Sequence, residues 1–402
     1  MAVLGDYISV KHGFAFKGDF ISTEDNGVVL VTPGNFAIGG GFKENKCKYF
    51  TSAYPSEYRL NAGDLIVTMT DLSKNGDTLG YSALVPDTER VYLHNQRIGL
   101  VKIKNNAISK DYLYWFMRTR NYQKQIVATS SGSTVKHTSP SRICEIEISL
   151  PSLENQNKIS GILNDIEQKI ILNNQINDNL LQQLDALFLE FCQKQQWSIT
   201  TIGEIAEKVA MGPFGSNIKV STFVDDGVPI ISGNHLRGYF LEEPTFNYIT
   251  DEHAAKLKNS LVHPKDIIFT HAGNIGQVAM IPDNSEYSTY IISQRQFYLR
   301  CNAKVLPEYV NLFFHSKRGQ FELLSYANQT GVPSISQPAT NLKKIELPLP
   351  PIEKQIHWYS VVKPIIELHQ SNYHETKRLS GIRDILLPKL MSGELDISNI
   401  DI

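Results

Sequence analysis

Residues that often perform chemistry occur throughout this sequence, but their spacing matches none of the familiar catalytic patterns. The chain has no GxxxxGK(S/T) phosphate loop, no GxGxxG dinucleotide turn and no HExxH zinc helix. It also lacks the GxSxG nucleophile elbow and the Asn-Pro-Pro-Tyr or Asp-Pro-Pro-Tyr motif of amino-methyltransferases. The run Gly39–Gly41 has neither the spacing nor the strand–helix context of a cofactor loop. We therefore expect no catalytic site and no cofactor in this chain.

Acidic and metal-ligating residues have equally simple explanations. PDTER at Pro86 and PDNSE at Pro282 loosely resemble the acidic cluster of a nuclease, but both lie between β-like runs and lack Glu-x-Lys, so turns are favoured. None of the eleven histidines forms a close pair at metal-ligand spacing. The four cysteines are scattered without a CxxC pair: Cys47, Cys144, Cys192 and Cys301. They favour neither a zinc site nor a disulfide framework, and they indicate a reducing cytoplasm.

Length and composition favour a soluble protein of more than one domain. At 402 residues the chain is too long for one small core. No apolar run approaches the ~20 residues of a membrane span, and the first residues lack the layout of a secretory signal. The net charge is -2, so any binding to DNA would need positive charge gathered on one face, or phosphate contacts supplied by partners.

An internal repeat with an offset of about 199 residues is the strongest pattern in the sequence. LPSLENQNKI begins at Leu150 and LPPIEKQIHW begins at Leu349, and both place a Glu and a Gln at the same positions. The other matching pairs are LGDYI (Leu4) and IGEIA (Ile202), AGDLIVT (Ala62) and PKDIIFT (Pro264), ISKDYLYWF (Ile108) and VLPEYVNLF (Val305), SGSTVKHTS (Ser131) and TGVPSISQP (Thr330), and EIEISLP (Glu145) and KIELPLP (Lys344). Because the matches keep their order, one duplication explains them better than chance similarity.

Each copy begins with a domain of mixed character. Its β-like runs are GVVLVT, DLIVTM and IGLVKI in the first copy and GVPIIS, DIIFTH and RQFYLRC in the second, separated by turn residues. One helical segment is predicted in each copy, over Lys110–Lys124 and Pro307–Tyr326. The aromatic runs in these segments could stack on bases, but their helical pattern favours a place in the core.

A long helix is predicted to end each copy. After Pro151 the sequence has no Pro and a single Gly before Trp197. The first apolar stripe consists of Ile159, Leu163, Ile166, Ile170, Leu180, Leu184, Leu187 and Phe191, with Asn173 and Asn177 between its halves. The second consists of Trp358, Val362, Ile365, His369, Asn372, Thr376, Leu379, Ile382, Leu386 and Leu390. Pro364 is expected to kink or restart the second helix. A seam of this length needs a partner, and the other copy's helix in antiparallel orientation is the simplest one.

This plan resembles the specificity subunit of type I restriction–modification enzymes. Two mixed domains are each followed by a long helix, with LP-x-(Leu/Ile)-E-x-Q at both junctions. GPFGSNIKVSTF (Gly212), GVPIISGNHLRGYF (Gly227) and FTHAGNIGQVAMIP (Phe269) are similar to recurring segments of that family's target-recognition domains. RLSGIRDILLPKLMSGEL, from Arg378, is similar to the end of its second conserved helix. The resemblance covers essentially the whole chain.

The resemblance implies an α+β fold with two pseudo-symmetric target-recognition domains, separated by two long antiparallel conserved helices that form a coiled-coil-like spacer. The expected boundaries are 1–150 for the first recognition domain, 151–196 for the first spacer helix, 197–349 for the second domain, 350–392 for the second helix and 393–402 for a tail. The tail is expected to pack near the first domain and to supply an edge that the first copy lacks ahead of Leu4.

The resemblance also implies a non-catalytic subunit in which each domain reads one half of a bipartite double-stranded DNA target. Two methyltransferase subunits would dock on the helical regions and hold S-adenosylmethionine for adenine-N6 methylation. Restriction subunits, with ATP and Mg, would join them for ATP-dependent DNA cleavage. The complex would be cytoplasmic, with no membrane partner.

Base-reading side chains are expected in polar loops between the β-like runs, because direct readout needs only a few well-placed donors and acceptors. The candidates in the first domain are Lys17, Lys74, Asn75, Asn95, Gln96, Arg97, Lys136 and His137. Those in the second are Ser216, Asn217, Lys219, Asn234, His235, Arg237, His271, Asn274, Gln294 and Arg295. For each of them, a solvated loop residue or a turn former is the simpler alternative.

The repeated junction residues Glu154, Gln156, Glu353 and Gln355 are expected to dock the partner or to pack the joint. A Glu in the first helical turn is favourable without any partner, but that does not explain the Gln two residues later.

Two other functions stay open at the level of sequence. One is a duplicated adaptor that binds proteins without recognising a DNA sequence, and the other is a self-contained modification enzyme.

Overall fold

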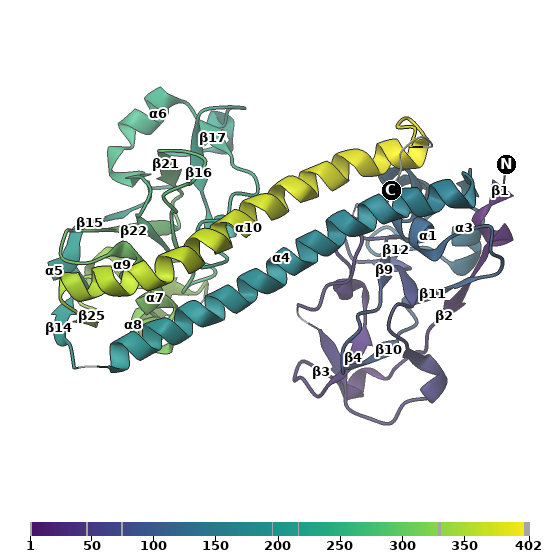
Figure 1. Ribbon diagram of the computed structural model, residues 1–402, viewed down its shortest axis with the longest axis horizontal. Coiled ribbons are helices and arrows are strands. Elements are labelled where there is room, and N and C mark those ends of the chain that lie inside the picture. The colour runs from purple at the N-terminus through teal and green to yellow at the C-terminus, as the bar shows by residue number, and fades with distance from the viewer. Residues whose placement is uncertain are drawn as a thin grey trace. The chain divides into compact units, whose positions relative to one another are not determined.

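The computed structural model describes residues 2–45, 47–73, 75–194, 196–215, 217–328 and 331–397. The chain divides into two compact units, which we call unit 1 (1–171 and 378–402) and unit 2 (172–377). Each unit holds one mixed domain and part of two long helices, α4 (Leu153–Gln193) and α10 (Ile352–Ser392), shown in Figure 1. Within the described ranges, no helix is both long and apolar enough to cross a membrane.

The mixed domain of unit 1 is built on two sheets. The first is antiparallel with the order β2-β11-β7-β9, and the second has the order β3-β5-β4-β10-β6 with β4 and β10 parallel. Two short ladders join β1 to β13 and β8 to β12. The strands are β1 (Ala2–Val3), β2 (Ile8–His12), β3 (Ile21–Ser22), β4 (Val28–Val31), β5 (Lys48–Phe50), β6 (Arg59–Leu60), β7 (Leu65–Thr68), β8 (Thr70–Asp71), β9 (Ser82–Leu84), β10 (Val91–His94), β11 (Ile98–Ile103), β12 (Lys136–His137) and β13 (Glu147–Ile148). The helices are η1 (Leu4–Asp6), η2 (Gly18–Phe20), η3 (Pro33–Asn35), η4 (Ser56–Tyr58), α1 (Lys110–Phe116), α2 (Arg120–Ala128) and α3 (Pro140–Cys144).

The mixed domain of unit 2 repeats this topology. Its antiparallel sheet has the order β15-β22-β19-β20, and its second sheet has the order β17-β16-β21-β18 with β16 and β21 parallel. The strands are β14 (Ser198–Thr201), β15 (Ala206–Met211), β16 (Val228–Ile231), β17 (Tyr248–Ile249), β18 (Leu261–Val262), β19 (Ile267–Thr270), β20 (Val278–Met280), β21 (Tyr290–Ile292), β22 (Gln296–Cys301), β23 (Ala327–Asn328), β24 (Ser334–Ile335) and β25 (Glu346–Leu349). The helices are α5 (Ile202–Ile205), η5 (Val220–Thr222), η6 (Gly233–His235), α6 (Asp251–Lys256), η7 (Lys258–Ser260), α7 (Pro307–His315), α8 (Lys317–Leu324) and α9 (Pro338–Leu342). The six β-like runs of the sequence all form strands, as predicted.

The core of unit 2 lies where α7 meets the antiparallel sheet on one side and the long helices on the other. Tyr309 of α7 is fully buried and lies 5.3 Å, ring to ring, from Phe188 of α4 and 5.9 Å from Trp358 of α10. Phe314, also on α7, contacts Phe269 of β19 edge to face. These aromatic side chains bury large apolar areas, so the predicted assignment of this segment to the core is confirmed.

The core of unit 1 has the same plan with different side chains. Trp115 of α1 is fully buried, and its indole N–H donates to Asn164 Oδ1 of α4 at 2.8 Å. Ile159 and Leu163 of α4 and Leu390 of α10 belong to the same buried cluster. The long helices therefore contribute directly to the domain cores and do not merely connect them.

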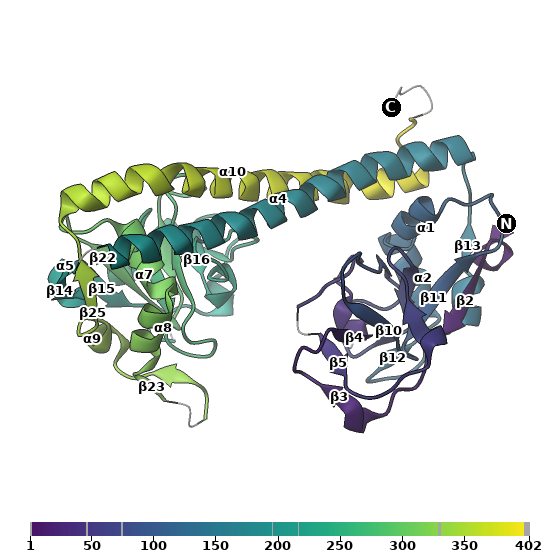
Figure 2. The same cartoon turned by 60° about the horizontal axis from the view of Figure 1, so that its bottom comes forward.

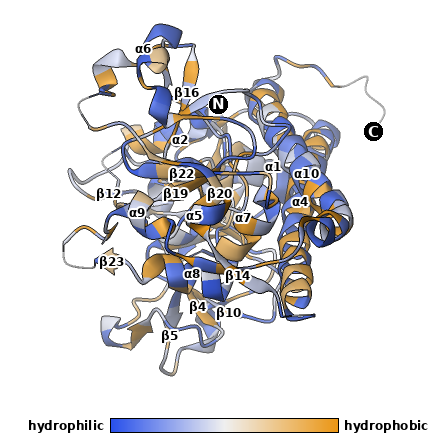
Figure 3. Ribbon diagram, turned by 90° about the vertical axis from the view of Figure 1, so that its left-hand side faces the viewer, coloured by the Kyte–Doolittle hydropathy of each residue, from blue (hydrophilic) through white to orange (hydrophobic). Residues whose placement is uncertain are grey.

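Within each unit, α4 and α10 run antiparallel, as predicted (Figures 1 and 2). Both helices carry hydrophobic and hydrophilic residues along their length (Figure 3). In unit 2 the polar positions of the stripe pair with one another: Asn372 Nδ2 donates to Asn177 Oδ1 at 3.0 Å, and Asn177 Nδ2 donates to the carbonyl of His369 at 3.1 Å. Amide pairs of this kind fix the register of a helical seam at some cost in stability.

The seam departs from the predicted stripe in unit 1. Ile382 is 39% exposed, and the neighbouring Arg383 instead faces α4 and forms an ion pair with Glu167 at 2.8 Å. A restart of the helix at Pro364 is also wrong, because α10 continues through it to Ser392, whereas a kink at this residue stays a prediction. Losing one backbone donor is tolerated there since Val362, on the same turn, is fully buried in the core of unit 2.

Each helical segment predicted in the mixed domains is two helices. In unit 1, α2 begins anew after Thr119, whose hydroxyl accepts a hydrogen bond from the Tyr122 N–H at 3.2 Å. In unit 2, Ser316 caps α8 in the same way through the Gly319 N–H at 3.1 Å. Serine and threonine are preferred N-caps, so Thr119 and Ser316 are the residues in the sequence that mark the start of the second helix.

The C-terminal tail packs within unit 1. Ile397 is 3% exposed and lies in the core cluster that contains Ile159 and Leu390. Over its described residues, up to Ile397, the tail forms no strand beside β1, and residues 398–402 lie outside the described ranges.

Candidate nucleic-acid interface

A tight turn between β21 and β22 presents two polar side chains at the surface of unit 2. The Gln296 N–H donates to the carbonyl of Ser293 at 3.0 Å and closes the turn, which leaves Gln294 and Arg295 exposed. The His271 N–H donates to the carbonyl of Arg295 at 2.9 Å, and His271 Nε2 contacts the carbonyl of Gln294 at 3.0 Å. The backbone that carries Gln294 and Arg295 is therefore held from both sides.

Glycines of two neighbouring loops lie against these side chains. A Cβ atom at Gly215 would collide with Oε1 of Gln294. A Cβ at Gly273, where φ is +88°, would lie 3.6 Å from Nη1 of Arg295. Glycine adopts such a positive φ without strain and permits a close approach. The loop after β15 and the loop after β19 thus flank the turn.

Unit 1 carries the same turn between β10 and β11. The Ile98 N–H donates to the carbonyl of Asn95 at 3.0 Å, and Gln96 and Arg97 are the exposed residues. The Met69 N–H donates to the carbonyl of Arg97 at 2.9 Å, as His271 does to Arg295 in unit 2. Gln96 and Arg97 are therefore the structural equivalents of Gln294 and Arg295.

The two arginines of these turns have no ion-pair partner among the residues that the structure describes. Four other arginines, in contrast, form ion pairs: Arg90 with Asp25, Arg118 with Glu167, Arg300 with Asp266 and Arg383 with Glu167. Arg97 and Arg295 are thus free to contact a ligand without breaking an internal pair.

A longer loop stands beside the turn in unit 1. It joins β8 to β9 and carries the exposed Asn75. Asp71, 5% exposed, accepts hydrogen bonds from the Ser73 N–H at 2.6 Å and from the Thr78 hydroxyl at 2.7 Å. Burial alone would raise the pKa of Asp71, but these hydrogen bonds outweigh it and lower the pKa. His137 of β12 contacts the hydroxyl of Thr70 at 3.2 Å, so the loop and the β12 segment are tied together.

The corresponding loop of unit 2 is tied to a hairpin. The Gly273 N–H donates to the carbonyl of Pro333, and the Ile335 N–H donates to the carbonyl of His271. Within unit 2, the β23 segment of this hairpin lies on the side away from α4 and α10 (Figure 2). Asn274 is exposed on the same loop.

The other predicted base readers divide into exposed and buried positions. The exposed or half-buried ones are Lys17, Lys136, Asn217, Lys219, Asn234 and Arg237. Asn95 and His235 are buried, at 6% and 4% exposure. Asn95 Oδ1 accepts from the Arg97 N–H, and His235 contacts the Ser232 N–H and the Thr245 carbonyl, so both brace loops and cannot reach a base. Lys74 and Ser216 lie outside the described residues.

The repeated glutamines are structural. Gln156 Oε1 accepts from the Ser109 N–H at 2.8 Å, and Gln355 Oε1 accepts from the Leu306 N–H at 2.8 Å. Each amide group donates to two carbonyls, and both side chains are fully buried. A partner cannot contact them in this conformation, so we correct the docking assignment of the two glutamines to packing of the joint. Glu154 and Glu353, by contrast, are exposed.

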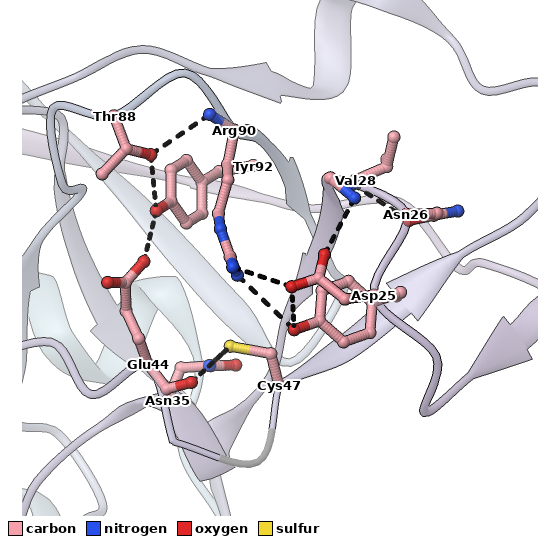
Figure 4. Close-up of polar contacts among 11 residues, drawn as sticks. Asp25, Asn26, Val28, Asn35, Glu44, Cys47, Thr88, Arg90 and Tyr92 are labelled. Atoms are coloured by element: carbon pink, nitrogen blue, oxygen red, sulfur yellow. Dashed lines mark hydrogen bonds and ion pairs between the residues drawn. The ribbon is translucent and has the colours of Figure 1, made fainter. Parts of the chain in front are cut away.

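A second repeated contact had not been found from the sequence. The Tyr92 hydroxyl donates to Glu44 at 2.6 Å in unit 1, and the Tyr290 hydroxyl donates to the buried Glu243 at 2.5 Å in unit 2. Figure 4 shows the first pair beside Arg90, whose guanidinium points at Asp25. Burial and the hydrogen bond from the hydroxyl to Glu44 raise the pKa of Tyr92 to about 12. Both pairs fasten the loop after β4 or β16 to the sheet that carries the turn.

No group of three or more His, Cys, Asp or Glu residues suited to a metal ion occurs within the described part of the chain. The four cysteines are free.

Comparison with known proteins identifies the family to which this chain belongs. A model described as the type I restriction modification DNA specificity domain matches residues 3–182 and 194–378. The chain belongs to this family. It is a DNA-recognition subunit of type I restriction–modification systems, and the alternative of a protein-binding adaptor is not favoured. The family of specificity subunits implies a non-catalytic role.

Named relatives agree with this assignment. The specificity subunit is 22% identical over 428 residues to the EcoBI specificity subunit of Escherichia coli, covering 96% of this chain and 84% of the relative. It is 24% identical over 331 residues to the MjaIX specificity subunit of Methanocaldococcus jannaschii, covering 74% and 72%. The crystal structure of the type I restriction–modification S subunit from M. genitalium has the same fold, with a TM-score of 0.59, 14% identity and coverage of 98% and 96%.

A subunit that recognises DNA has two tasks, which are to present side chains to the DNA and to hold those side chains in place. The exposed Gln-Arg turns have the chemistry for the first task, because both side chains form paired hydrogen bonds to base edges. The buried glutamines and the two Tyr–Glu pairs serve the second. The signal that would have revealed the Tyr–Glu pairs is their recurrence at the offset of the repeat.

Proposed function

We propose that this specificity subunit reads a bipartite double-stranded DNA target, one half with each mixed domain, and performs no reaction itself. The observation that supports the proposal most strongly is the recurrence of the exposed Gln-Arg turn at the same place in both domains. The segments that we assign to recognition are 1–150 and 197–349, with 151–196 and 350–392 as spacer helices and 393–402 as a tail on the first domain.

The predicted base readers that are exposed or half-buried form the proposed DNA contacts, and we call the set in each domain its reading face. In the first domain they are Lys17, Asn75, Gln96, Arg97, Lys136 and His137. In the second they are Asn217, Lys219, Asn234, Arg237, His271, Asn274, Gln294 and Arg295. About half to two-thirds of protein–DNA hydrogen bonds go to the backbone, so only some of these residues specify bases. The net charge of -2 leaves many phosphate contacts to partner subunits.

The partners in this proposal are two methyltransferase subunits, which hold S-adenosylmethionine and methylate adenine N6. Restriction subunits, which use ATP and Mg, complete a cytoplasmic complex that cleaves DNA. The joints marked by Glu154 and Glu353 begin the two long helices, and both glutamates are exposed beside Leu153 and Ile356, which are 45% and 55% exposed. Exposed apolar side chains with a charged residue at their edge match the general layout of a protein–protein interface, which has an apolar centre and a polar rim.

The docking part is tested by charge reversal. Glu154→Lys and Glu353→Lys should each weaken assembly with the cognate methyltransferase. Each glutamate lies in the first turn of its helix, and Glu154 pairs with Lys158 at 3.2 Å, so the free energy of unfolding of the free chain should fall by only about 1 kcal/mol. Glu89→Lys, an exposed position in the first mixed domain, is the matched control. Normal assembly of both joint variants would remove the support for docking at the joints.

The recognition part is tested by salt-dependent DNA binding and by methylation of random-sequence DNA, with and without the methyltransferase. We expect sequence preference in two separated blocks when the partner is present. An absence of preference in the assembled complex would refute the proposal. If the helices set the spacing, one heptad inserted at matching positions of α4 and α10 adds about 10 Å, so the gap should lengthen by about three base pairs.

A further inference from the structure

The two Gln-Arg turns share more than their residue types. In each of them the carbonyl of the arginine accepts a hydrogen bond from the residue that follows the neighbouring strand, Met69 after β7 or His271 after β19. The residue after the arginine, Ile98 or Gln296, is buried at 0% or 1% exposure. The arginine therefore leaves the sheet from the same backbone position in both domains.

The surroundings of the two turns differ. The chain between β7 and β9 covers residues 69–81 with the short strand β8 inside it, whereas the chain between β19 and β20 covers only residues 271–277. Asp71 organises the first loop, whereas Gly273 occupies the second. The Gln-Arg pair is thus the same in the two units, whereas the loops beside it differ between them. The pair therefore has a role that does not depend on those loops.

The chemistry of an arginine at this position favours a base over a phosphate. Its guanidinium is planar and carries a fork of donors that matches O6 and N7 of guanine, the commonest specific arginine contact in the major groove. Arginine also binds phosphate in a bidentate manner. Phosphates recur at every nucleotide, however, so a phosphate contact does not explain why the same Gln-Arg pair occupies one backbone position in two domains whose flanking loops differ. Here the backbone of each turn is anchored by hydrogen bonds to neighbouring segments. The neutral Gln beside each arginine carries no charge that attracts a phosphate, but its amide group can form paired hydrogen bonds with a base edge.

We propose that Arg97 and Arg295 each read a guanine, so that both halves of the DNA target contain a G·C pair at equivalent positions of the two reading faces. This inference rests on the proposed function and makes it more specific. The remaining bases of each half are read by the flanking loops, which differ between the domains, so the half-sites share this pair without being copies of each other.

The test uses the assembled complex with its methyltransferase and duplexes that contain the mapped target. One guanine at a time is replaced by 7-deazaguanine, which exchanges the N7 acceptor for C–H and keeps Watson–Crick pairing. For the wild-type complex, one analogue in each half should lower the methylation rate at limiting enzyme between about 5-fold and 150-fold.

The arginine variants connect each analogue to one domain. In the Arg97→Ala complex, the analogue in one half of the target should cause no further loss of methylation rate, whereas the analogue in the other half should keep its full effect on that rate. Arg295→Ala should show the reverse. Arg97→Lys and Arg295→Lys keep the charge and a donor for guanine, so they should retain part of the analogue effect that the alanine variants lose. The full effect of the analogue in the opposite half shows that each variant is folded. Arg120→Ala and Arg318→Ala remove exposed arginines from α2 and α8 and should affect all duplexes equally.

The outcomes separate the inference from the function beneath it. A bipartite target with no G·C pair in one half would overturn the inference and leave the proposed function intact. So would analogue effects that persist unchanged in both arginine variants. A complex without any sequence preference would overturn both.

Discussion

The buried glutamine at the start of α10 gives the sharpest test of how the joint is built. Gln355 makes three hydrogen bonds: Oε1 accepts from Leu306 N–H at 2.8 Å, and Nε2 donates to the carbonyls of Pro350 at 2.7 Å and Lys304 at 3.3 Å. Gln355→Glu keeps the shape and the first bond. It replaces both donated bonds by contacts between a carboxylate oxygen and a carbonyl oxygen.

The size of the effect follows from these contacts. Two lost hydrogen bonds cost about 1 kcal/mol each, and leaving the two buried carbonyls unsatisfied adds a comparable amount. A charge buried without a partner raises the total further, so we expect the free energy of unfolding of unit 2 to fall by about 3 to 5 kcal/mol at pH 7.5. Protonation of the introduced carboxylate restores one hydrogen-bond donor. The folded-state pKa of the new Glu should therefore lie above its unfolded value of about 4.3, and the deficit should shrink as the pH falls through the folded pKa.

Urea unfolding followed by tryptophan fluorescence measures this effect. Trp358 and Trp197 report on unit 2, and Trp115 reports on unit 1. Gln156→Glu is the matched change in unit 1 and should shift the transition of Trp115 instead. Gln182→Glu, at an exposed position of α4, is the control and should change stability by less than about 0.5 kcal/mol. The account of the joint is refuted if Gln355→Glu is as stable as wild type but fails to bind the methyltransferase, because the glutamine would then serve the partner.

Three further predictions concern the cores and the seam. Arg118 is 6% exposed and bonds to Gly39 and Glu167, so Arg118→Ala should destabilise unit 1 by about 3 kcal/mol in urea. Lys102→Ala breaks an exposed ion pair and should cost less than about 1 kcal/mol. Similar losses of stability in the two variants would contradict the structural role of Arg118. Burial lowers the pKa of His315 to about 4, below the unfolded value of about 6.5, so the unfolded chain takes up the proton first and unit 2 should lose roughly 3 kcal/mol as the pH falls from 7 to 4. His315→Phe keeps the stacking on Tyr239 and should remove that part of the pH dependence, whereas an unchanged pH profile would show that His315 is not its source. The double change Asn177→Leu and Asn372→Leu removes a buried amide pair and should raise the thermal stability of unit 2 while weakening the register of the seam; a large loss of stability would show that the pair is essential to the fold.

Local patterns in the sequence predicted the elements well. Runs such as DLIVTM and DIIFTH became β7 and β19 because their β-branched and apolar residues fill a buried sheet. The repeat predicted that the two domains share one topology, and the heptad spacing predicted the antiparallel helices. The helix restart considered at Pro364 does not occur, since the burial of Val362 in the core of unit 2 outweighs the loss of one donor.

The site was harder to predict, because side-chain direction depends on turns that bring distant segments together. Asn95 and Gln96 are adjacent polar residues, yet Asn95 folds back on the Arg97 N–H and only Gln96 faces solvent. Glu44 and Tyr92 are 48 residues apart, and no local pattern joins them. The role of Gln355 could not be decided from spacing, because packing and docking both place a polar residue in the first helical turns.

The central claim is that the two domains read the two halves of one target independently. The most direct measurement is methylation mapping of DNA modified by the assembled complex, with the wild-type chain and with a chain whose residues 1–149 come from another specificity subunit. We predict that one half of the target changes, while the other half and the spacing stay the same. Changes in both halves, or in neither, would contradict the account.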